Sequence, residues 1–195
     1  MKKKLTLLVA FVLVFALGVA GTFAYLTSSA TVTNTFTVGK VAITLDEQDV
    51  DNSTEGKDRD TANAYNLLPG HTYTKDPIIH VDADSENSWV FVKVENGIAA
   101  YEATTVENGY KSINDQILAN GWTLLSNGVY YQTYTKGQAD KDLEVFGEFK
   151  VADEANKVSG WSDITAESTK IVVTGYAIQS DGFTTAQAAW AEVSK

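Results

Sequence analysis

A strict two-residue alternation, following directly on an apolar N-terminal run, is the feature that most constrains this chain. From Thr31 to Val38 every odd position is threonine, and the even positions are valine, asparagine, phenylalanine and valine. A period of two places successive side chains on opposite faces, so this segment is predicted to form a strand with one buried face. The apolar phase changes after Gly39, in the segment Val41–Leu45. Because a one-residue shift exchanges the two faces, Gly39 is predicted to be a bulge or a break between two strands.

Most of the remaining chain also has strand character. Ser88–Glu95 alternates between an inner valine face and an opposite face with Trp89 and Phe91. Segments rich in β-branched and aromatic residues, bounded by Asn-Gly and Asp-Gly turn signals, predict three further strands. These segments are Gly128–Thr135, Leu143–Val151 and Ser168–Gln179. Two short helices are predicted at Ser112–Ala119 and Thr184–Val193 from apolar residues at helical spacing. Many short strands with few helices indicate an all-β sandwich.

The first 24 residues have the pattern of a secretory signal peptide. Lys2–Lys4 form a basic start, Leu5–Ala20 is apolar, and Thr22 and Ala24 place small residues before a cut at Tyr25. The alternative is a retained membrane anchor, since a stretch of about 20 apolar residues can span a bilayer. We therefore predict residues 1–24 as the signal peptide and 25–195 as a single secreted domain, with membrane contact only through an uncleaved signal segment.

Composition narrows the class of partner. Loss of the three N-terminal lysines leaves 12 basic against 25 acidic residues, a formal charge of −13. Such a chain is a poor partner for nucleic acid, because phosphate neutralisation requires clustered lysine and arginine. The absence of cysteine excludes disulfides, thiolate metal sites and cysteine nucleophiles.

An acidic loop is predicted over residues 46–60. Five oxygen-bearing side chains in it fall at positions 1, 3, 5, 7 and 12 of a window that resembles an EF-hand loop: Asp49, Asp51, Ser53, Glu55 and Asp60. The match is poor, because Thr54 stands where the EF-hand requires glycine and no flanking helices are visible. A solvated loop without a cofactor is the prediction, and calcium bound through these oxygens is the alternative.

The chain is predicted not to be an enzyme. A zinc hydrolase of the His-Glu-x-x-His type needs two histidines one helical turn apart, whereas His71 and His80 are nine residues apart in an extended segment. No nucleophile elbow or phosphate-binding glycine loop is present. Both histidines are predicted to lie in loops or at strand edges, and a metal site formed with a spatially adjacent acid is the alternative.

Five patches resemble the TasA/camelysin family of secreted proteins from Gram-positive bacteria. The segment 18–27, Gly-Val-Ala-Gly-Thr-Phe-Ala-Tyr-Leu-Thr, is similar to a SipW-dependent signal peptide. The segment 32–47 is similar to the mature start of that family. Further similarity lies in Leu-Pro-Gly-His-Thr-Tyr-Thr-Lys-Asp-Pro-Ile-Ile-His-Val (68–81), Trp-Val-Phe-Val-Lys-Val-Glu-Asn (89–96) and Gly-Phe-Thr-Thr-Ala-Gln-Ala-Ala-Trp (182–190).

The resemblance implies a fold and a function. The fold would be a jelly-roll-like antiparallel β-sandwich with one or two short helices. The function would be a structural protein of the extracellular biofilm matrix, exported through a dedicated signal peptidase and assembled into homopolymeric fibres. One branch, camelysin, is described as a metalloprotease. A camelysin-like secreted metalloprotease and a monomeric cell-surface binding module are therefore the alternatives.

Strand donation is the predicted route of assembly. A sheet edge accepts an extra strand through main-chain hydrogen bonds, and alternate side chains fill pockets. Residues 25–38 would leave their own domain and add to the next copy, where Val32, Phe36 and Val38 fill the pockets. Gly39 would supply the bend. The alternative is that this strand completes its own sandwich.

Cleavage after Ala24 is the first testable prediction. Because Thr22 and Ala24 offer small residues to a signal peptidase, N-terminal sequencing of secreted protein should begin at Tyr25. A membrane-bound product that retains Lys2–Lys4 would contradict it.

Overall fold

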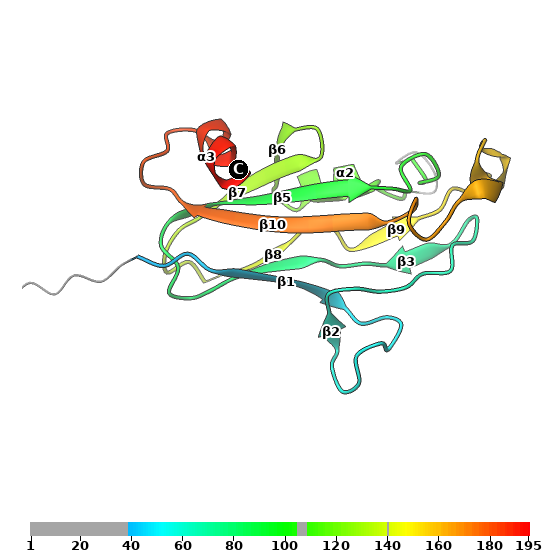
Figure 1. Cartoon of the computed structure of the whole chain (residues 1–195), viewed down its shortest axis with the longest axis horizontal. Helices are drawn as coiled ribbons and strands as arrows, with labels where there is room; N and C mark the ends of the chain where they lie inside the picture. The colour runs from blue at the N-terminus through cyan, green and yellow to red at the C-terminus, as the bar shows by residue number, and fades with distance from the viewer. Residues whose placement is uncertain (1–38, 105–108, 140) are drawn as a thin grey trace, which may run out of the picture. The chain divides into compact units, whose positions relative to one another are not determined.

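A computed structural model describes residues 39–104, 109–139 and 141–195 (Figure 1). These residues belong to one compact unit. The predicted signal peptide, its cleavage site at Ala24 and Tyr25, and the alternating strand 31–38 lie outside the described residues.

The first sheet has four antiparallel strands in the order β2-β1-β4-β8. Their bounds are β1 (Ile43–Gln48), β2 (Arg59–Asp60), β4 (Ile78–Val81) and β8 (Asp142–Glu144). Strand β1 alternates as the sequence predicts, with Ile43 and Leu45 turned toward the core. The strand extends to Gln48. The predicted bounds of the acidic loop, 46–60, are therefore wrong at both ends, because Asp46–Gln48 and Arg59–Asp60 are paired in the sheet.

A short ladder of β3 (Thr72–Thr74) and β9 (Glu148–Lys150) continues the β4–β8 pairing. Backbone hydrogen bonds from Lys75 to Gly147 (3.1 Å) and from Val145 to Pro77 (2.9 Å) connect the two ladders. The break falls at Pro77, which has no N–H to donate. The single strand predicted at Leu143–Val151 is therefore wrong, since it is divided into β8 and β9.

The second sheet is also antiparallel, with the order β10-β5-β7-β6. Its strands are β5 (Ser88–Asn96), β6 (Thr123–Ser126), β7 (Val129–Tyr134) and β10 (Ile171–Gln179). The predicted division of β5 into two faces is confirmed, because Val90 and Val92 join the main core while Phe91 joins a second cluster on the other side.

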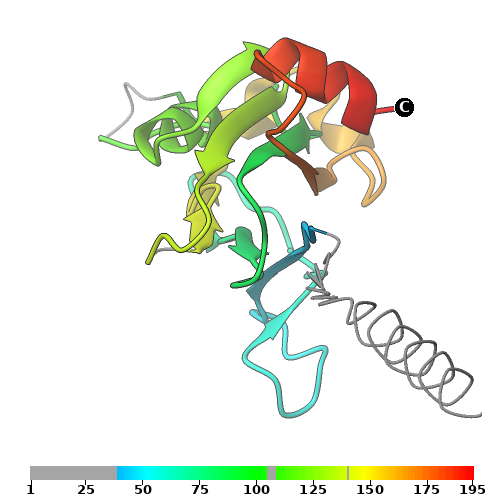
Figure 2. The same ribbon diagram turned by 90° about the vertical axis from the view of Figure 1, so that its left-hand side faces the viewer.

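One hydrophobic core receives side chains from both sheets, including Ile79 from β4, Val92 from β5, Tyr134 from β7 and Leu143 from β8. Figures 1 and 2 show the β1-β4-β8 strands facing the β10-β5-β7 strands. The two sheets approach closely at Gly175 of β10, where an added Cβ would meet Ile79 Cδ1 at 3.2 Å.

Two α-helices lie in the described residues, α2 (Ile113–Ala119) and α3 (Ala186–Val193), together with two 3₁₀ turns at Ala155–Lys157 and Trp161–Asp163. Ser112 caps α2 by accepting from the Asp115 N–H, and Thr185 caps α3 by accepting from the Ala188 N–H. Helix α3 covers the outer face of the second sheet (Figures 1 and 2).

The all-β antiparallel class is thus confirmed, and the strands predicted at Ser88–Glu95, Gly128–Thr135 and Ser168–Gln179 are found within one to three residues. Both helices are confirmed. Strands β2, β3 and β6 were not predicted.

The turn after β5 provides a test of the fold. A Cβ at Gly97 would lie 2.5 Å from the Lys170 carbonyl oxygen and 2.8 Å from that of Ser168. Neither backbone oxygen can move freely, so Gly97→Ala should lower the free energy of unfolding by about 2 kcal/mol. In the control Gly147→Ala, the nearest atom is the mobile carboxylate of Glu144. Urea denaturation of both variants measures the difference, and equal stabilities would contradict the prediction.

Candidate functional site

A groove lies between the neighbouring strands β1 and β10. It encloses about 440 Å³ and is lined by Leu45 and Glu47 of β1, residues 61–63, and the chain from Lys170 to Val173. Apolar atoms come from Leu45, Ile171 and Val173, while Lys75 and Glu47 supply charge. The groove lies toward the Lys170–Val173 end of β10, whereas the Ile43 side chain approaches Gly175 further along the strand.

A second cavity of about 290 Å³ continues the groove. The two share Asn63, Lys75, Lys170 and Ile171 among their lining residues. Two aromatic residues, Tyr65 and Phe149, line the second cavity. The Phe149 ring packs edge-on against Tyr65 (5.2 Å between centroids) and stacks on Tyr73 (5.0 Å). Burial, followed by the Glu47 carboxylate, raises the pKa of Tyr65. Its hydroxyl therefore stays protonated and donates to the Thr74 carbonyl at 2.9 Å.

Lys75 and Glu47 form a buried ion pair beside the groove. Lys75 is 9% exposed and Glu47 is 4% exposed, and the lysine Nζ donates to Glu47 Oε2. The other carboxylate oxygen accepts from Asn63 Nδ2 at 3.1 Å. Removing one partner of such a pair would leave an uncompensated charge, which typically costs about 3–5 kcal/mol.

The outer edge of β10 pairs with no other strand in the part of the chain that the structure describes. Among the described residues β10 pairs only with β5, and its nine residues contain no charge and no proline. Val172 is 41% exposed on this strand. Natural edge strands are usually protected by shortness, charge or proline, and β10 has none of these.

The other outer strands of the two sheets are short. Strand β8 has three residues, two of them acidic, and β6 has four. Strand β2 covers the end of β1, and its pairing is reinforced by Arg59, whose guanidinium donates to Asp46 Oδ1 at 2.5 Å and to Asp76 Oδ2 at 2.8 Å. The single long, unprotected edge in the described structure is therefore that of β10.

His80 lies on the outer face of β4 between two carboxylates. Its Nδ1 is 2.6 Å from Asp142 Oδ1 and its Nε2 is 3.1 Å from Asp46 Oδ1. Partial burial acts to lower the pKa of His80, but the hydrogen bonds to Asp142 and Asp46 outweigh it, so the pKa is raised. The ring connects β8, β4 and β1 across the sheet. The prediction of an edge or loop position for His80 is wrong, because β4 lies between β1 and β8.

His71 lies elsewhere and forms no site with His80. Its ring is exposed, and Nδ1 is 3.1 Å from the Pro69 carbonyl oxygen. Its predicted loop position is confirmed, since His71 immediately precedes β3. Within the described ranges, neither histidine belongs to a group of three or more side chains placed to share a metal ion.

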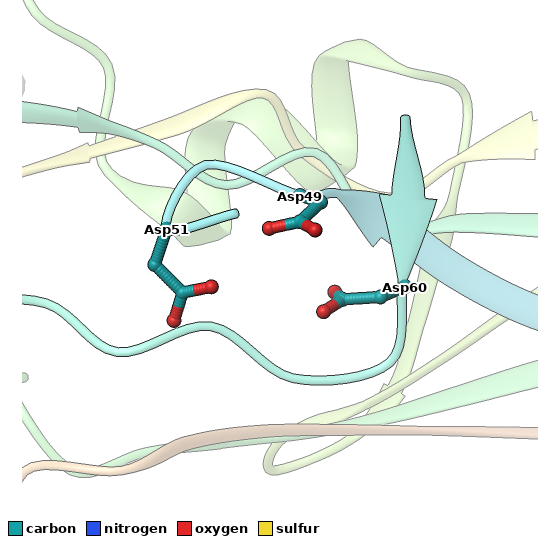
Figure 3. Close-up of side chains that lie close together, drawn as sticks. All are labelled: Asp49, Asp51 and Asp60. Carbon is teal, nitrogen blue, oxygen red and sulfur yellow. The ribbon is translucent and has the colours of Figure 1, made fainter. Parts of the chain in front are cut away.

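Three of the five oxygen ligands predicted in the acidic loop converge. Carboxylate oxygens of Asp49, Asp51 and Asp60 lie within 4.8 Å of one another (Figure 3). Ser53 joins them, donating from Oγ to Asp60 at 2.9 Å. Glu55 is exposed and is not one of the converging carboxylates.

Backbone N–H groups explain this convergence. Asp49 accepts from the Ser53 and Thr54 N–H groups, and Asp51 accepts from Ser53 (3.0 Å) and Ala64 (2.6 Å). The bond from Ala64, followed by that with Ser53, lowers the pKa of Asp51. The carboxylates therefore fold the loop upon itself.

Of the predicted assembly residues, only Gly39 is described. It is exposed and precedes an isolated bridge between Lys40 and Ser85. Val32, Phe36 and Val38 lie outside the described residues.

Comparisons with protein-family models, with curated proteins and with solved structures gave no match. In the described part of the chain, no helix combines the length and apolar character needed to cross a bilayer.

The position of His80 predicts a pH-dependent stability. A raised folded-state pKa stabilises the fold fully below the ordinary histidine value of about 6.5, and this contribution is lost as the pH rises through the folded pKa. The stability difference between wild type and His80→Gln should therefore be largest near pH 5.5 and smaller at pH 8.5. Urea denaturation at both values measures it.

The matched control for this measurement is His71→Gln, since no carboxylate bonds to His71 in the described ranges. A difference for His80→Gln that grows with pH, or one equal to that of the control, would contradict the prediction.

Proposed function

We propose that this chain is a secreted structural protein that assembles into extracellular fibres by strand donation, with a jelly-roll-like β-sandwich as its repeating unit. The observation that carries the proposal is the edge of β10. A nine-residue strand without charge or proline is a template for another strand, and the alternating segment 31–38 is of matching length.

The groove beside β10 supports the same role. Strand addition gains affinity from main-chain hydrogen bonds and specificity from pockets for alternate side chains. The apolar surface from Leu45, Ile171 and Val173 suits residues such as Val32, Phe36 and Val38. Gly39 immediately precedes the described fold, so the donor segment is joined to it without a long linker.

Donation between copies yields a filament because the donor and the acceptor are different surfaces. Such head-to-tail contacts propagate unless the rotation closes a ring. The resemblance to the TasA/camelysin family supports a biofilm-matrix setting and export through a dedicated signal peptidase. The histidine positions and the carboxylate geometry offer no observation that favours the metalloprotease alternative.

Fibre formation tests the proposal. Deletion of residues 25–38 should leave a folded monomer, because a donated strand would complete the next copy and not its own domain. Phe36→Asp should also abolish fibres, since it buries an unpaired charge in the acceptor. Thr35→Asp is the matched control, because the same charge then lies on the opposite face of the strand.

Electron microscopy of the exported protein gives the readout, and circular dichroism checks folding. A synthetic peptide of residues 25–38 should block growth of wild-type fibres. Unfolding of the deleted protein would show that the strand belongs to its own core, and fibres formed by Phe36→Asp would contradict donation.

A further inference from the structure

The inward face of the first sheet, which forms one wall of the groove, is not apolar at every position. Along β1 the inward positions are Ile43, Leu45 and Glu47, and along the β3–β4 segment they include Tyr73, Lys75, Pro77 and Ile79. Apolar residues occupy these positions except where Glu47 and Lys75 meet. One charged pair therefore stands in an otherwise apolar inward face.

Lys75 has hydrogen-bonding capacity that the described structure does not use. An ammonium group carries three donors, and among the described residues Glu47 alone accepts from Lys75 Nζ. Lys75 lines both cavities of the groove. This nearly buried cation therefore borders the groove in which the proposed incoming strand would lie.

The donor segment has a corresponding irregularity. Its apolar phase consists of positions 32, 34, 36 and 38, and Asn34 is the one polar residue among them. An asparagine amide offers one acceptor oxygen and two N–H donors. It can accept from an ammonium group and donate to a carboxylate at the same time.

We propose that Asn34 of an incoming copy contacts the Lys75–Glu47 pair and thereby sets the register of the donated strand. This inference rests on the proposed strand donation. Asn34 Oδ1 accepts from Lys75, and its Nδ2 donates to Glu47. Other cavity-lining groups, including the Asn63 amide already bonded to Glu47, complete the polar surroundings.

Incorrect registers are disfavoured by different costs. A shift of two residues places Val32 or Phe36 over the ion pair, so the charges lose water without gaining a partner. A shift of one residue turns the threonine face inward and exposes Phe36. A single buried polar contact that selects register at some cost in stability is well attested in coiled coils.

Paired substitutions in the exported full-length chain test this inference. The donor variant is Asn34→Leu, and the acceptor variant combines Glu47→Leu with Lys75→Met, which keeps side-chain volume while removing both charges. In the donor variant a leucine meets the ion pair, and in the acceptor variant Asn34 meets an apolar surface. Fibre growth of each variant alone should therefore slow by about tenfold or more. A chain carrying all three substitutions should recover growth.

Mixing the two defective proteins gives the sharpest result. The donor strand that carries Asn34→Leu fits the apolar groove of the acceptor variant. The acceptor variant keeps Asn34 in its own donor strand, and this strand fits the unchanged groove of the donor variant. The mixture should therefore form an alternating copolymer, although neither protein polymerises well alone. Thr33→Leu, on the opposite face of the donor, is the matched control and should behave as wild type.

Register is measured directly by a photo-cross-linking amino acid at position 36. Wild-type fibres should give one cluster of cross-linked residues, whereas fibres or adducts of Asn34→Leu should give further clusters displaced by two residues. This measurement needs no change in the acceptor, so it remains decisive if circular dichroism shows that the Glu47→Leu, Lys75→Met protein is unfolded.

The outcomes separate this inference from the proposed function. If wild-type protein forms no fibres and the peptide 25–38 does not bind, strand donation itself fails. If wild-type fibres form but Asn34→Leu grows at the same rate with an identical cross-link map, donation stands and the register inference is overturned. A folded acceptor variant whose mixture with Asn34→Leu stays unpolymerised also overturns it.

Discussion

The two sheets approach each other closely where the Ile79 and Ile43 side chains pack against Gly175. A Cβ at Gly175 would lie 3.2 Å from Ile79 Cδ1 and 3.4 Å from Ile43 Cδ1, so this position permits an approach that a larger residue would prevent. The contact holds β1 beside β10 at one end. Toward Lys170 the same strands border the groove, several residues away from this contact.

The Lys75–Glu47 pair shows how an unfavourable local choice can serve specificity. Two charges on inward positions contribute less to stability than a well-packed apolar pair of similar volume would. The fold tolerates them because Asn63 completes the carboxylate and because the cavities leave room for water. A pair that stabilises little but rejects apolar partners is suited to selecting what lies against it.

The sequence predicted elements whose signals are local. Strand β5 was predicted because the residues Ser88–Glu95 place valines on one face and Trp89 and Phe91 on the other. Helices α2 and α3 were predicted from apolar residues at helical spacing, and the structure adds the caps Ser112 and Thr185. The two-residue period of β1 places Glu47 on the same face as Ile43 and Leu45. Because Glu47 belongs to the acidic run that begins at Asp46, it was assigned to the loop instead. The central position of β4 depends on pairing with β8, more than sixty residues away, and no local pattern encodes that distance.

Of the proposed donor strand and acceptor edge, only the donor strand could be predicted from the sequence, because only its pattern is local. The alternation of residues 31–38 is visible in the chain. The proposed acceptor edge is visible only in the folded chain, where β10 pairs on one side with β5 and on the other with no described strand. Strand β10 by itself has the pattern of a buried strand, because it carries valine, isoleucine and tyrosine without charge. Its composition is that of an interior strand, yet the described fold places it at an edge. Within the proposed fibre this conflict disappears, because a donated strand would make β10 an interior strand of a five-stranded sheet.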